Sequence, residues 1–309
     1  MRIIRHLERA PAPHGASIVT LGNFDGVHVG HQESLSRVVR QARERNGRSV
    51  VVTFFPHPSA VLAPARAPAA LGSLGQRLER IRESGVDTVL LQRFTREFAK
   101  LTALEFIERF LVDGLGAVKV IIGHSVSFGR NRRGSAATLE QAGTRFGFAV
   151  EVVGPVKVDG VDVSSTRVRQ AVSEGEVDLA ARLLGRPYAV EGRVVVGDRR
   201  GRGLGFPTAN LRPRIPILAP DGVYAVRVKL PDGNLANGVA NVGRKPTFGP
   251  GHERTLEAHL FEFDGDLYGR RLDVSLLGRL RGEMRFPSVE ALVAQIEKDV
   301  ASARRVLGA

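Results

Sequence analysis

The pattern of apolar and polar positions divides the chain into two halves of different kind. In the first half, short apolar runs alternate with segments in which apolar residues recur every three or four positions. The predicted strands are residues 17–24, 49–54, 86–92, 117–123 and 148–153, and the predicted helices are 32–45, 74–83, 99–115 and 164–184. Strands separated by helices are typical of βαβ units, so we expect a Rossmann-like α/β domain with a parallel sheet. The stretch 60–70, rich in Ala and Pro, is predicted to be a loop.

The second half consists of strand-like runs separated by turn residues. These runs are residues 188–197, 222–230, 237–243, 255–263 and 271–277. Consecutive strands without intervening helices predict an antiparallel β-barrel. A final helix is predicted after Ser288, a good N-cap, and its apolar stripe comprises Leu292, Val293, Ile296, Val300 and Val306. The change of pattern at Gly185-Arg186-Pro187 predicts two domains, residues 1–186 and 187–309.

The composition excludes several classes of protein. The chain has 309 residues, of which 43% are hydrophobic, and it has no cysteine. Disulfides, thiolate catalysis and cysteine metal sites are therefore excluded. No apolar run approaches the roughly 18 residues that a membrane helix needs, and the N-terminus does not resemble a signal peptide. We expect a cytoplasmic protein without a membrane partner.

The net charge of +13 raises the possibility of a nucleic-acid partner. However, the basic excess is spread over both halves, and the chain has only 3 Tyr and no Trp for base stacking, although it has 15 Phe. Nucleic acid is therefore not the expected partner. Anionic small molecules such as nucleotides fit the charge equally well.

Two histidines three positions apart are the first candidate for chemistry. His28 and His31 directly follow a predicted strand and precede a predicted helix, with Gly26 and Gly30 between strand and helix. The free N-terminus of such a helix attracts phosphate, and imidazoles there can donate hydrogen bonds to phosphate oxygens. A zinc site needs a third ligand, for which only His57 is an obvious candidate. The pattern thus favours phosphate contacts over a metal site, and over two histidines with only capping or packing roles.

A second candidate site is the glycine- and arginine-rich stretch 197–210 at the start of the barrel half. Its composition is that of a phosphate-binding loop, although it lacks the ending of a Walker A motif. Thr208 and Asn210 are two positions apart, so their side chains share a side of an extended chain and offer oxygen ligands suited to Mg²⁺. Glu257 lies in a predicted strand on the same face as Thr255 and His259, where a carboxylate can accept a proton.

These motifs together resemble a known family. The string His28-Val29-Gly30-His31 resembles the His-x-Gly-His signature of nucleotidyltransferases. The whole chain resembles the bifunctional prokaryotic riboflavin kinase/FMN adenylyltransferase family, also called FAD synthetase. The strings that carry this resemblance are residues 20–31, Ser164-Ser165-Thr166-Arg167-Val168-Arg169, residues 201–210, Gly238-Val239-Ala240-Asn241-Val242-Gly243, Pro246-Thr247-Phe248 and Asp266-Leu267-Tyr268-Gly269.

The resemblance implies two reactions and a set of site residues. The C-terminal barrel would convert riboflavin and ATP into FMN and ADP, and the N-terminal domain would convert FMN and ATP into FAD and pyrophosphate. The implied ATP-binding residues of the adenylyltransferase are Gly22, Asn23, Phe24, Gly26, His28, Gly30, His31, Ser164, Ser165, Thr166 and Arg167. Those of the kinase are Gly201, Arg202, Gly203, Gly205, Phe206, Pro207, Thr208 and Asn210. Thr208 and Asn210 would bind Mg²⁺, and Glu257 would be the base on the ribityl 5′-hydroxyl.

Three residues depart from the family pattern, all in the first half. Phe55 stands where the family has an acid, Ser125 where it has Asp or Asn, and Val126 where it has an aromatic residue. These departures leave open an alternative, a riboflavin kinase whose adenylyltransferase half is degenerate. A more remote alternative is a basic nucleic-acid-binding or flavin-sensing regulator. We expect a monomer or weak homo-oligomer.

Overall fold

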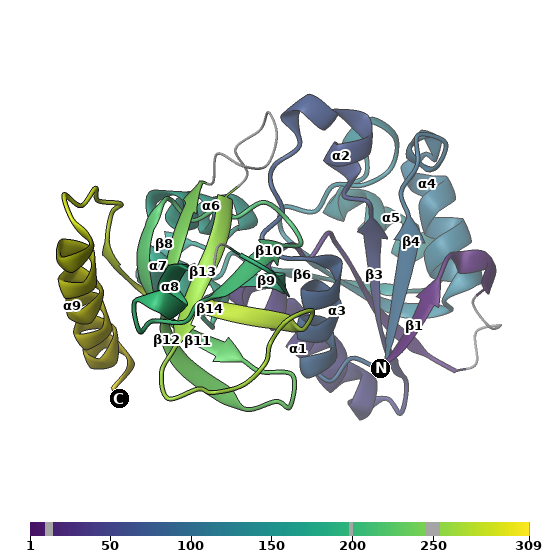
Figure 1. Cartoon of the computed structure of the whole chain (residues 1–309). Helices are drawn as coiled ribbons and strands as arrows, with labels where there is room; N and C mark the ends of the chain where they lie inside the picture. The colour runs from purple at the N-terminus through teal and green to yellow at the C-terminus, as the bar shows by residue number, and fades with distance from the viewer. Residues whose placement is uncertain (10–14, 198–199, 245–253, 309) are drawn as a thin grey trace. The chain divides into compact units, whose positions relative to one another are not determined.

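A computed structural model describes residues 1–9, 15–197, 200–244 and 254–308, and the chain divides into two compact units. The first unit comprises Met1–Pro68 and Leu74–Val163. The second comprises Ala69–Ser73 and the chain from Ser164 onward. Figure 1 shows the parallel sheet of the first unit and the barrel of the second.

The first unit is built on a six-stranded sheet in which every neighbouring pair is parallel. The strands are β1 (Arg2–Arg5), β2 (Ser17–Leu21), β3 (Arg48–Phe55), β4 (Thr88–Arg93), β5 (Ala117–Gly123) and β6 (Ala149–Val153). Their order is β1-β4-β3-β2-β5-β6, which confirms the predicted Rossmann-like class. Strand β2 ends at Leu21, three residues earlier than predicted, because the chain turns there into a loop. Strand β1 was not predicted, because its four residues have Arg at both ends and show no apolar run.

The connections of the first unit contain helices and a small hairpin. The helical segments are η1 (Leu7–Arg9), α1 (Val29–Glu44), α2 (Pro58–Leu62), η2 (Pro64–Arg66), α3 (Leu74–Glu83), η3 (Phe98–Lys100), α4 (Ala103–Phe106), η4 (Ile107–Gly114), η5 (Arg130–Arg132) and α5 (Ala136–Phe146), and the hairpin strands are β7 (Lys157–Val158) and β8 (Val161–Asp162). The prediction of one helix over 99–115 is wrong. The predicted helix is interrupted before Ala103, where a capping box between Thr102 and Glu105 starts α4. The segment η4 is a π-helix. The predicted loop 60–70 is wrong in part, since it overlaps α2 and η2.

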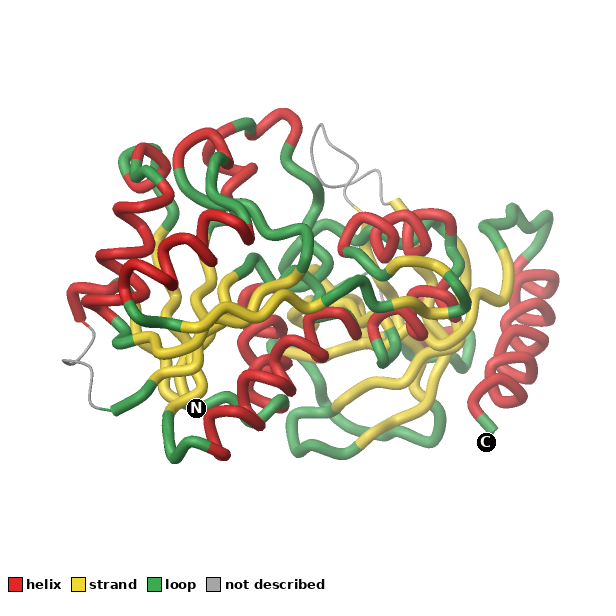
Figure 2. The backbone as a smooth tube through the Cα atoms, turned by 180° about the vertical axis from the view of Figure 1, so that it is seen from behind, coloured by secondary structure: helices red, strands yellow, loops and turns green. Residues whose placement is uncertain are grey.

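Apolar clusters cover both faces of the sheet. Because side chains alternate along a strand, Val51 and Val89 face Leu35 of α1 and Ile81 of α3. Val50, Val52 and Leu90 belong instead to a cluster with Phe106, Phe110 and Leu139, from α4, η4 and α5. Figure 2 shows helices on both sides of the sheet, the arrangement of a doubly wound α/β fold.

The second unit is a closed antiparallel barrel, as predicted. Its strands are β9 (Tyr188–Val195), β10 (Ala209–Pro213), β11 (Gly222–Lys229), β12 (Leu235–Arg244), β13 (Arg254–Leu260) and β14 (Arg271–Arg281). They close in the order β10-β13-β12-β11-β14-β9. The prediction missed β10, because its sequence Ala-Asn-Leu-Arg-Pro contains a proline and only one large apolar residue after a glycine-rich loop.

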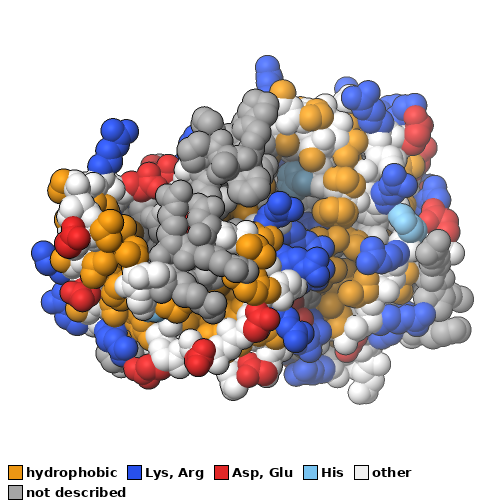
Figure 3. Space-filling model, in the orientation of Figure 1, with side chains coloured by type: hydrophobic (Ala, Val, Ile, Leu, Met, Phe, Trp, Pro, Cys, Tyr) orange, Lys and Arg blue, Asp and Glu red, His pale blue; other side chains and the backbone are white. Residues whose placement is uncertain are grey.

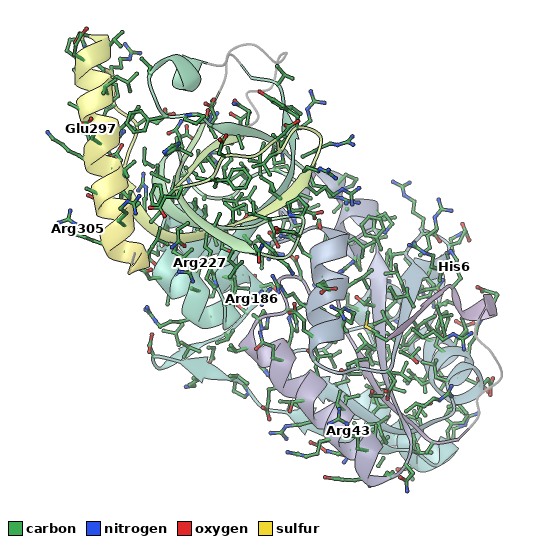
Figure 4. The ribbon with its side chains drawn as sticks, turned by 60° about the horizontal axis from the view of Figure 1, so that its bottom comes forward. His6, Arg43, Arg186, Arg227, Glu297 and Arg305 are labelled. Atoms are coloured by element: carbon green, nitrogen blue, oxygen red, sulfur yellow. The ribbon has the colours of Figure 1, made fainter. Side chains whose placement is uncertain are left out.

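Helices α6 (Ser165–Glu174), α7 (Val177–Leu184), α8 (Arg200–Gly203) and α9 (Val289–Leu307) complete the second unit. The predicted N-cap of α9 is confirmed, since the Ser288 hydroxyl accepts a hydrogen bond from the Ala291 N–H at 3.2 Å. Val306 of the predicted apolar stripe is 49% exposed, and the buried side chains of α9 are Asp299, Ala303 and Leu307. Glu297 and Arg305 project from α9 away from the barrel (Figure 4).

The predicted boundary between residues 186 and 187 can be tested on fragments. Helix α7 packs against β9 and β14 and buries Val177, Leu183 and Leu184. A fragment of residues 187–309 lacks this helix, so its free energy of unfolding should be lower than that of residues 164–309 by roughly 5 kcal/mol, from about 1.5–3 kcal/mol per buried side chain. Urea unfolding of both fragments checks this. Equal midpoints would place the boundary at residue 187.

Candidate functional site

The first candidate site lies beyond the carboxyl end of β2. Strand β2 pairs with β3 on one side and with β5 on the other, so the order of strands reverses between β2 and β5. In open α/β sheets, ligands bind outside the carboxyl ends of the strands at such a point. The loop after β2 leads directly to His28, and the loop after β5 contains Ser125 and Val126. The topology therefore supports the place that the sequence predicted.

His28 and His31 lie against each other at the start of α1. Their rings are stacked with centroids 3.7 Å apart. His28 is the N-cap, and its Nδ1 accepts a hydrogen bond from the His31 N–H at 3.3 Å. The neutral His28 ring therefore carries its proton on Nε2. A Cβ at Gly30 would lie 3.3 Å from the His28 ring, so a side chain at this position would press on the histidine. Capping and ligand binding are thus compatible roles for His28, because capping uses only one ring nitrogen.

The ring of His31 is held in its neutral form. Burial lowers the pKa of His31 well below 6.5, and the neighbouring His28 lowers it further. Its Nδ1 is buried and has no hydrogen-bond partner within the described part of the chain. Buried polar atoms are seldom left unsatisfied without a reason, and a bound ligand is one. The neutral ring can serve as a hydrogen-bond donor to an anion at pH 7.

The lowered pKa of His31 predicts a pH dependence of stability. The unfolded chain protonates this histidine near pH 6.5 while the folded chain does not, so the unfolded state binds more protons below that pH. The free energy of unfolding of the first unit should be fully retained above about pH 6.5 and should fall as the pH is lowered, by at most about 1.4 kcal/mol per pH unit. Urea unfolding between pH 8 and 5 should show a shallower dependence for His31→Gln than for His124→Gln, where the histidine is exposed. Equal slopes in the two variants would contradict this.

The other predicted residues of the first unit form the loop between β2 and α1. The Gly22 N–H donates to the Val52 carbonyl at 3.1 Å, which holds the loop against β3. Phe24 is buried, and its ring centroid lies 5.1 Å from that of His31. His57 is the N-cap of α2, shortly after the carboxyl end of β3, and its Nδ1 accepts a hydrogen bond from the Ser59 N–H. Within the described residues, no group of three or more His, Asp or Glu side chains could hold a metal ion.

The three departures from the family pattern occur at the carboxyl ends of strands. Phe55 ends β3 and is 47% exposed. Ser125 follows β5 and is exposed, whereas Val126 packs partly against the core cluster on that face. Val126 is thus part of the packing, and only Phe55 and Ser125 present altered side chains to solvent at this edge of the sheet.

The Ser164–Arg167 segment belongs to the second unit, whereas the histidines belong to the first. Ser164 is the N-cap of α6, and its hydroxyl accepts a hydrogen bond from the Arg167 N–H at 3.2 Å. The Arg167 guanidinium lies 4.0 Å from Glu174 and 3.8 Å from Glu176. Ser165 and Thr166 occupy the first turn of the helix. The predicted helix start is confirmed, and its grouping with His28 and His31 stays a prediction.

The second candidate site lies on the barrel where β10 meets β13. Asn210 of β10 is directly opposite Glu257 of β13, and Glu257 is in turn opposite Asn241 of β12. Along β13, the half-buried residues Thr255, Glu257 and His259 alternate with buried apolar ones, which confirms that these three share a face. The register thus brings together an amide and a carboxylate that are 47 positions apart in the sequence.

The loop before β10 leaves room for the amide of Asn210. A Cβ at Gly197 would lie 2.4 Å from the amide group, so a side chain at this position would displace the amide of Asn210. The Phe206 N–H donates to the Gly201 carbonyl at 2.9 Å and closes the turn around Gly203 and Gly205. The predicted positions Asp198, Arg199, the side chain of Arg202 and residues 246–248 lie outside the described part.

The donor atoms near this loop suit a hard cation. A hydroxyl from Thr208, an amide oxygen from Asn210 and a carboxylate from Glu257 are all oxygen ligands. Mg²⁺ is commonly held by one or two protein oxygens together with substrate phosphates and water. The residues present therefore fit Mg²⁺ bound with ATP.

Sequence reasoning missed two residues that hold these loops. The carbonyl of Pro207 can only accept, so the Nδ1–H of His259 donates to it at 2.9 Å and ties the residue before Thr208 to β13. His259 could have been identified from the sequence, because it shares a face of its predicted strand with Glu257. Arg77 of α3 is the other. Its side chain is buried and donates to the carbonyl of Asn23, a contact that no local sequence pattern indicates.

Comparisons with known proteins match both units. A family model described as FAD synthetase matches residues 10–167, and one described as riboflavin kinase matches residues 184–307. The bifunctional riboflavin kinase/FMN adenylyltransferase of Pseudomonas fluorescens is 44% identical over 307 residues, which cover 98% of this chain and 97% of that protein. The protein of the same name from Escherichia coli strain K12 is 41% identical over 309 residues, 100% of this chain and 98% of that one.

A solved structure from Streptococcus pneumoniae has the same fold over the whole chain. It is described as a macrolide-efflux protein, with a TM-score of 0.87 and 33% sequence identity, and the match covers 98% of this chain and 99% of that one. None of the helices in residues 1–9, 15–197, 200–244 and 254–308 is long and apolar enough to cross a membrane.

Proposed function

The chain belongs to the family of bifunctional riboflavin kinases/FMN adenylyltransferases, and we propose that the residues described above form two separate sites, one for each of the two reactions. The enzyme phosphorylates riboflavin with ATP to give FMN, and it transfers AMP from a second ATP to FMN, giving FAD and pyrophosphate. The observation that carries the residue assignment is the placement of Asn210 directly opposite Glu257 on the barrel.

In the kinase site, Glu257 accepts the proton of the ribityl 5′-hydroxyl as the hydroxyl oxygen attacks the γ-phosphorus of ATP, and the bond from that phosphorus to the β-phosphate oxygen breaks to release ADP. Asn210 and Thr208 hold the phosphate end of ATP beside this carboxylate. They would also hold Mg²⁺, which when bound neutralises charge on the phosphates. His259 keeps the backbone before Thr208 in place through its hydrogen bond to Pro207.

In the adenylyltransferase site, a phosphate oxygen of FMN attacks the α-phosphorus of ATP, and the bond to the β-phosphate breaks to release pyrophosphate. The ring N–H groups of His28 and His31 donate to the phosphate oxygens, where negative charge develops. The 16-residue helix α1 adds the positive end of its dipole at the same place. Ser164, Ser165, Thr166 and Arg167 complete the ATP contacts in this proposal.

The alternative of a kinase with a degenerate adenylyltransferase half is not favoured. Both family models match, and the bifunctional relatives align over nearly their whole length. The regulator that binds nucleic acid is not favoured either. The face shown in Figure 3 carries acidic and apolar side chains among its Lys and Arg side chains. We place the enzyme in the cytoplasm, where ATP is supplied, as a monomer or weak homo-oligomer.

A chromatographic assay tests this function. Purified protein with riboflavin, ATP and Mg²⁺ should yield FMN first and FAD later, and omission of Mg²⁺ should suppress FMN formation. Absence of FMN would overturn the kinase assignment. FMN that accumulates without FAD, even when FMN and ATP are supplied at saturation, would revive the degenerate alternative.

A further inference from the structure

Arg77 is a buried charge that neither proposed reaction uses. It lies on α3, and its side chain is only 9% exposed. Its Nη1 donates to the carbonyl of Asn23 at 2.7 Å, and its Nη2 donates to the carbonyl of Phe54 at 3.1 Å. Asn23 follows β2 and Phe54 is near the end of β3. One guanidinium thus ties the carboxyl ends of two adjacent strands to a helix.

We propose that Arg77 is a positioning residue for FAD formation, because it fixes the loop of residues 22–28 that leads into the His28–His31 pair. This proposal rests on the assignment of FAD formation to the first unit. Arg77 bonds to the backbone of the loop and acts through it. The histidines are the groups that contact ATP.

The loop needs such support because its backbone is strained. Phe24 has a φ of 50° and Val27 a φ of 41°, in the left-handed region that a β-branched residue such as valine rarely adopts. Strained conformations of this kind persist only where the surroundings over-determine them, and they concentrate at functional sites. Val27 is the residue immediately before His28, so relaxation of its φ would rotate the start of α1.

Side chains from outside the loop donate to the carbonyls of Asn23 and Val27, and the donor from Arg77 is charged. Gln32 Nε2 donates to the Val27 carbonyl at 2.8 Å, and Thr53 Oγ1 donates to the Asn23 carbonyl at 3.3 Å. The Arg77 bond to Asn23 is 2.7 Å long. Hydrogen bonds from ionised donors are roughly twice as strong as neutral ones. Loss of the guanidinium would leave the Asn23 carbonyl with one long neutral bond from Thr53.

The electrostatic setting also favours a role at the site. Burial lowers the pKa of Arg77, and the nearby Asp25 raises it. Asp25 is itself 8% exposed and belongs to the same loop. Replacing a buried ion pair by apolar groups is often neutral or stabilising, so stability alone gives little reason for a charge here. The shape of the guanidinium gives a specific reason for an arginine here, because its planar fork of N–H donors bridges two carbonyls. A lysine ammonium cannot reproduce this geometry.

Substitution of Arg77 tests this proposal, with the kinase activity of the same protein as an internal control. Arg77→Met should lower kcat for FAD formation about 100-fold, the effect of displacing catalytic groups by about 1 Å, while the KM for FMN changes little. Arg77→Lys, which keeps the charge but not the fork, should be intermediate. Riboflavin phosphorylation should stay at the wild-type rate in both variants. Arg82→Met is the matched control, since Arg82 lies on the same helix and pairs with Glu79 on its exposed side.

The outcomes separate this proposal from the function on which it rests. Absence of FAD formation by the wild-type enzyme would contradict the function itself. A folded Arg77→Met enzyme that forms FAD at the wild-type rate overturns only the positioning role. A lowered melting temperature with unchanged kcat overturns it also, because that is the result of a merely structural contact. If the Met variant does not fold, the Lys variant decides: a kcat for FAD formation equal to that of Arg82→Met overturns the proposal.

Discussion

Glu257→Gln is expected to lower kcat for riboflavin phosphorylation by about 10²–10⁴-fold, the usual contribution of a general base. Glutamine keeps the size of the side chain and its place opposite Asn210, but it cannot take the proton of the attacking hydroxyl. FAD formation from supplied FMN should be unchanged, since the histidines lie in the other unit. Both rates are measured by separation of the flavins in one assay.

The matched control for this variant is Glu297→Gln. Glu297 projects from α9 into solvent and belongs to the same unit as Glu257 (Figure 4). Its substitution should leave both rates at the wild-type level. A Glu257→Gln enzyme that still phosphorylates riboflavin at a wild-type rate would show that another group, or water, accepts the proton.

His31→Ala is expected to have the opposite selectivity. It should lower kcat for FAD formation by about 10²–10³-fold, the range found when one preorganised donor to a developing anion is removed. The stacked ring beside His28 is lost as well, so the capping geometry at the start of α1 loosens. Riboflavin phosphorylation in the same sample should be unaffected and shows that the protein is folded. A selective loss of the kinase activity would instead reverse the assignment of the two sites.

The order of elements was predictable from the sequence, because it depends on local patterns. Alternation of apolar runs with helical periodicity gave the parallel sheet, and the helix start at Ser288 followed from its capping residue. The single helix predicted over 99–115 merged η3 with α4 and η4, because apolar residues recur at helical spacing through all three. The break at Thr102 is set by a capping box of two polar side chains.

The site residues were predictable to different degrees. His28, His31, Thr208 and Asn210 lie in compact motifs, so residue types and spacing were enough to propose them as site residues. Glu257 could be chosen only through the family resemblance, because its partner across the sheet is 47 positions away in β10, a strand that the pattern did not reveal. Arg77 could not be found at all. Its function depends on backbone carbonyls at positions 23 and 54, and no side-chain pattern reports which carbonyl an arginine will meet.

We infer that two separate sites perform the two reactions, and a complementation assay tests this claim. The Asn210→Ala and His31→Ala enzymes are each incubated with riboflavin, ATP and Mg²⁺, then mixed, and the flavins are separated over time. Neither variant alone should form FAD from riboflavin at an appreciable rate: the first should lack FMN, and the second should accumulate it. The mixture should form FAD, because FMN made by the His31→Ala enzyme is adenylylated by the Asn210→Ala enzyme. Loss of both activities in either folded variant, with no FAD from the mixture, would contradict the claim.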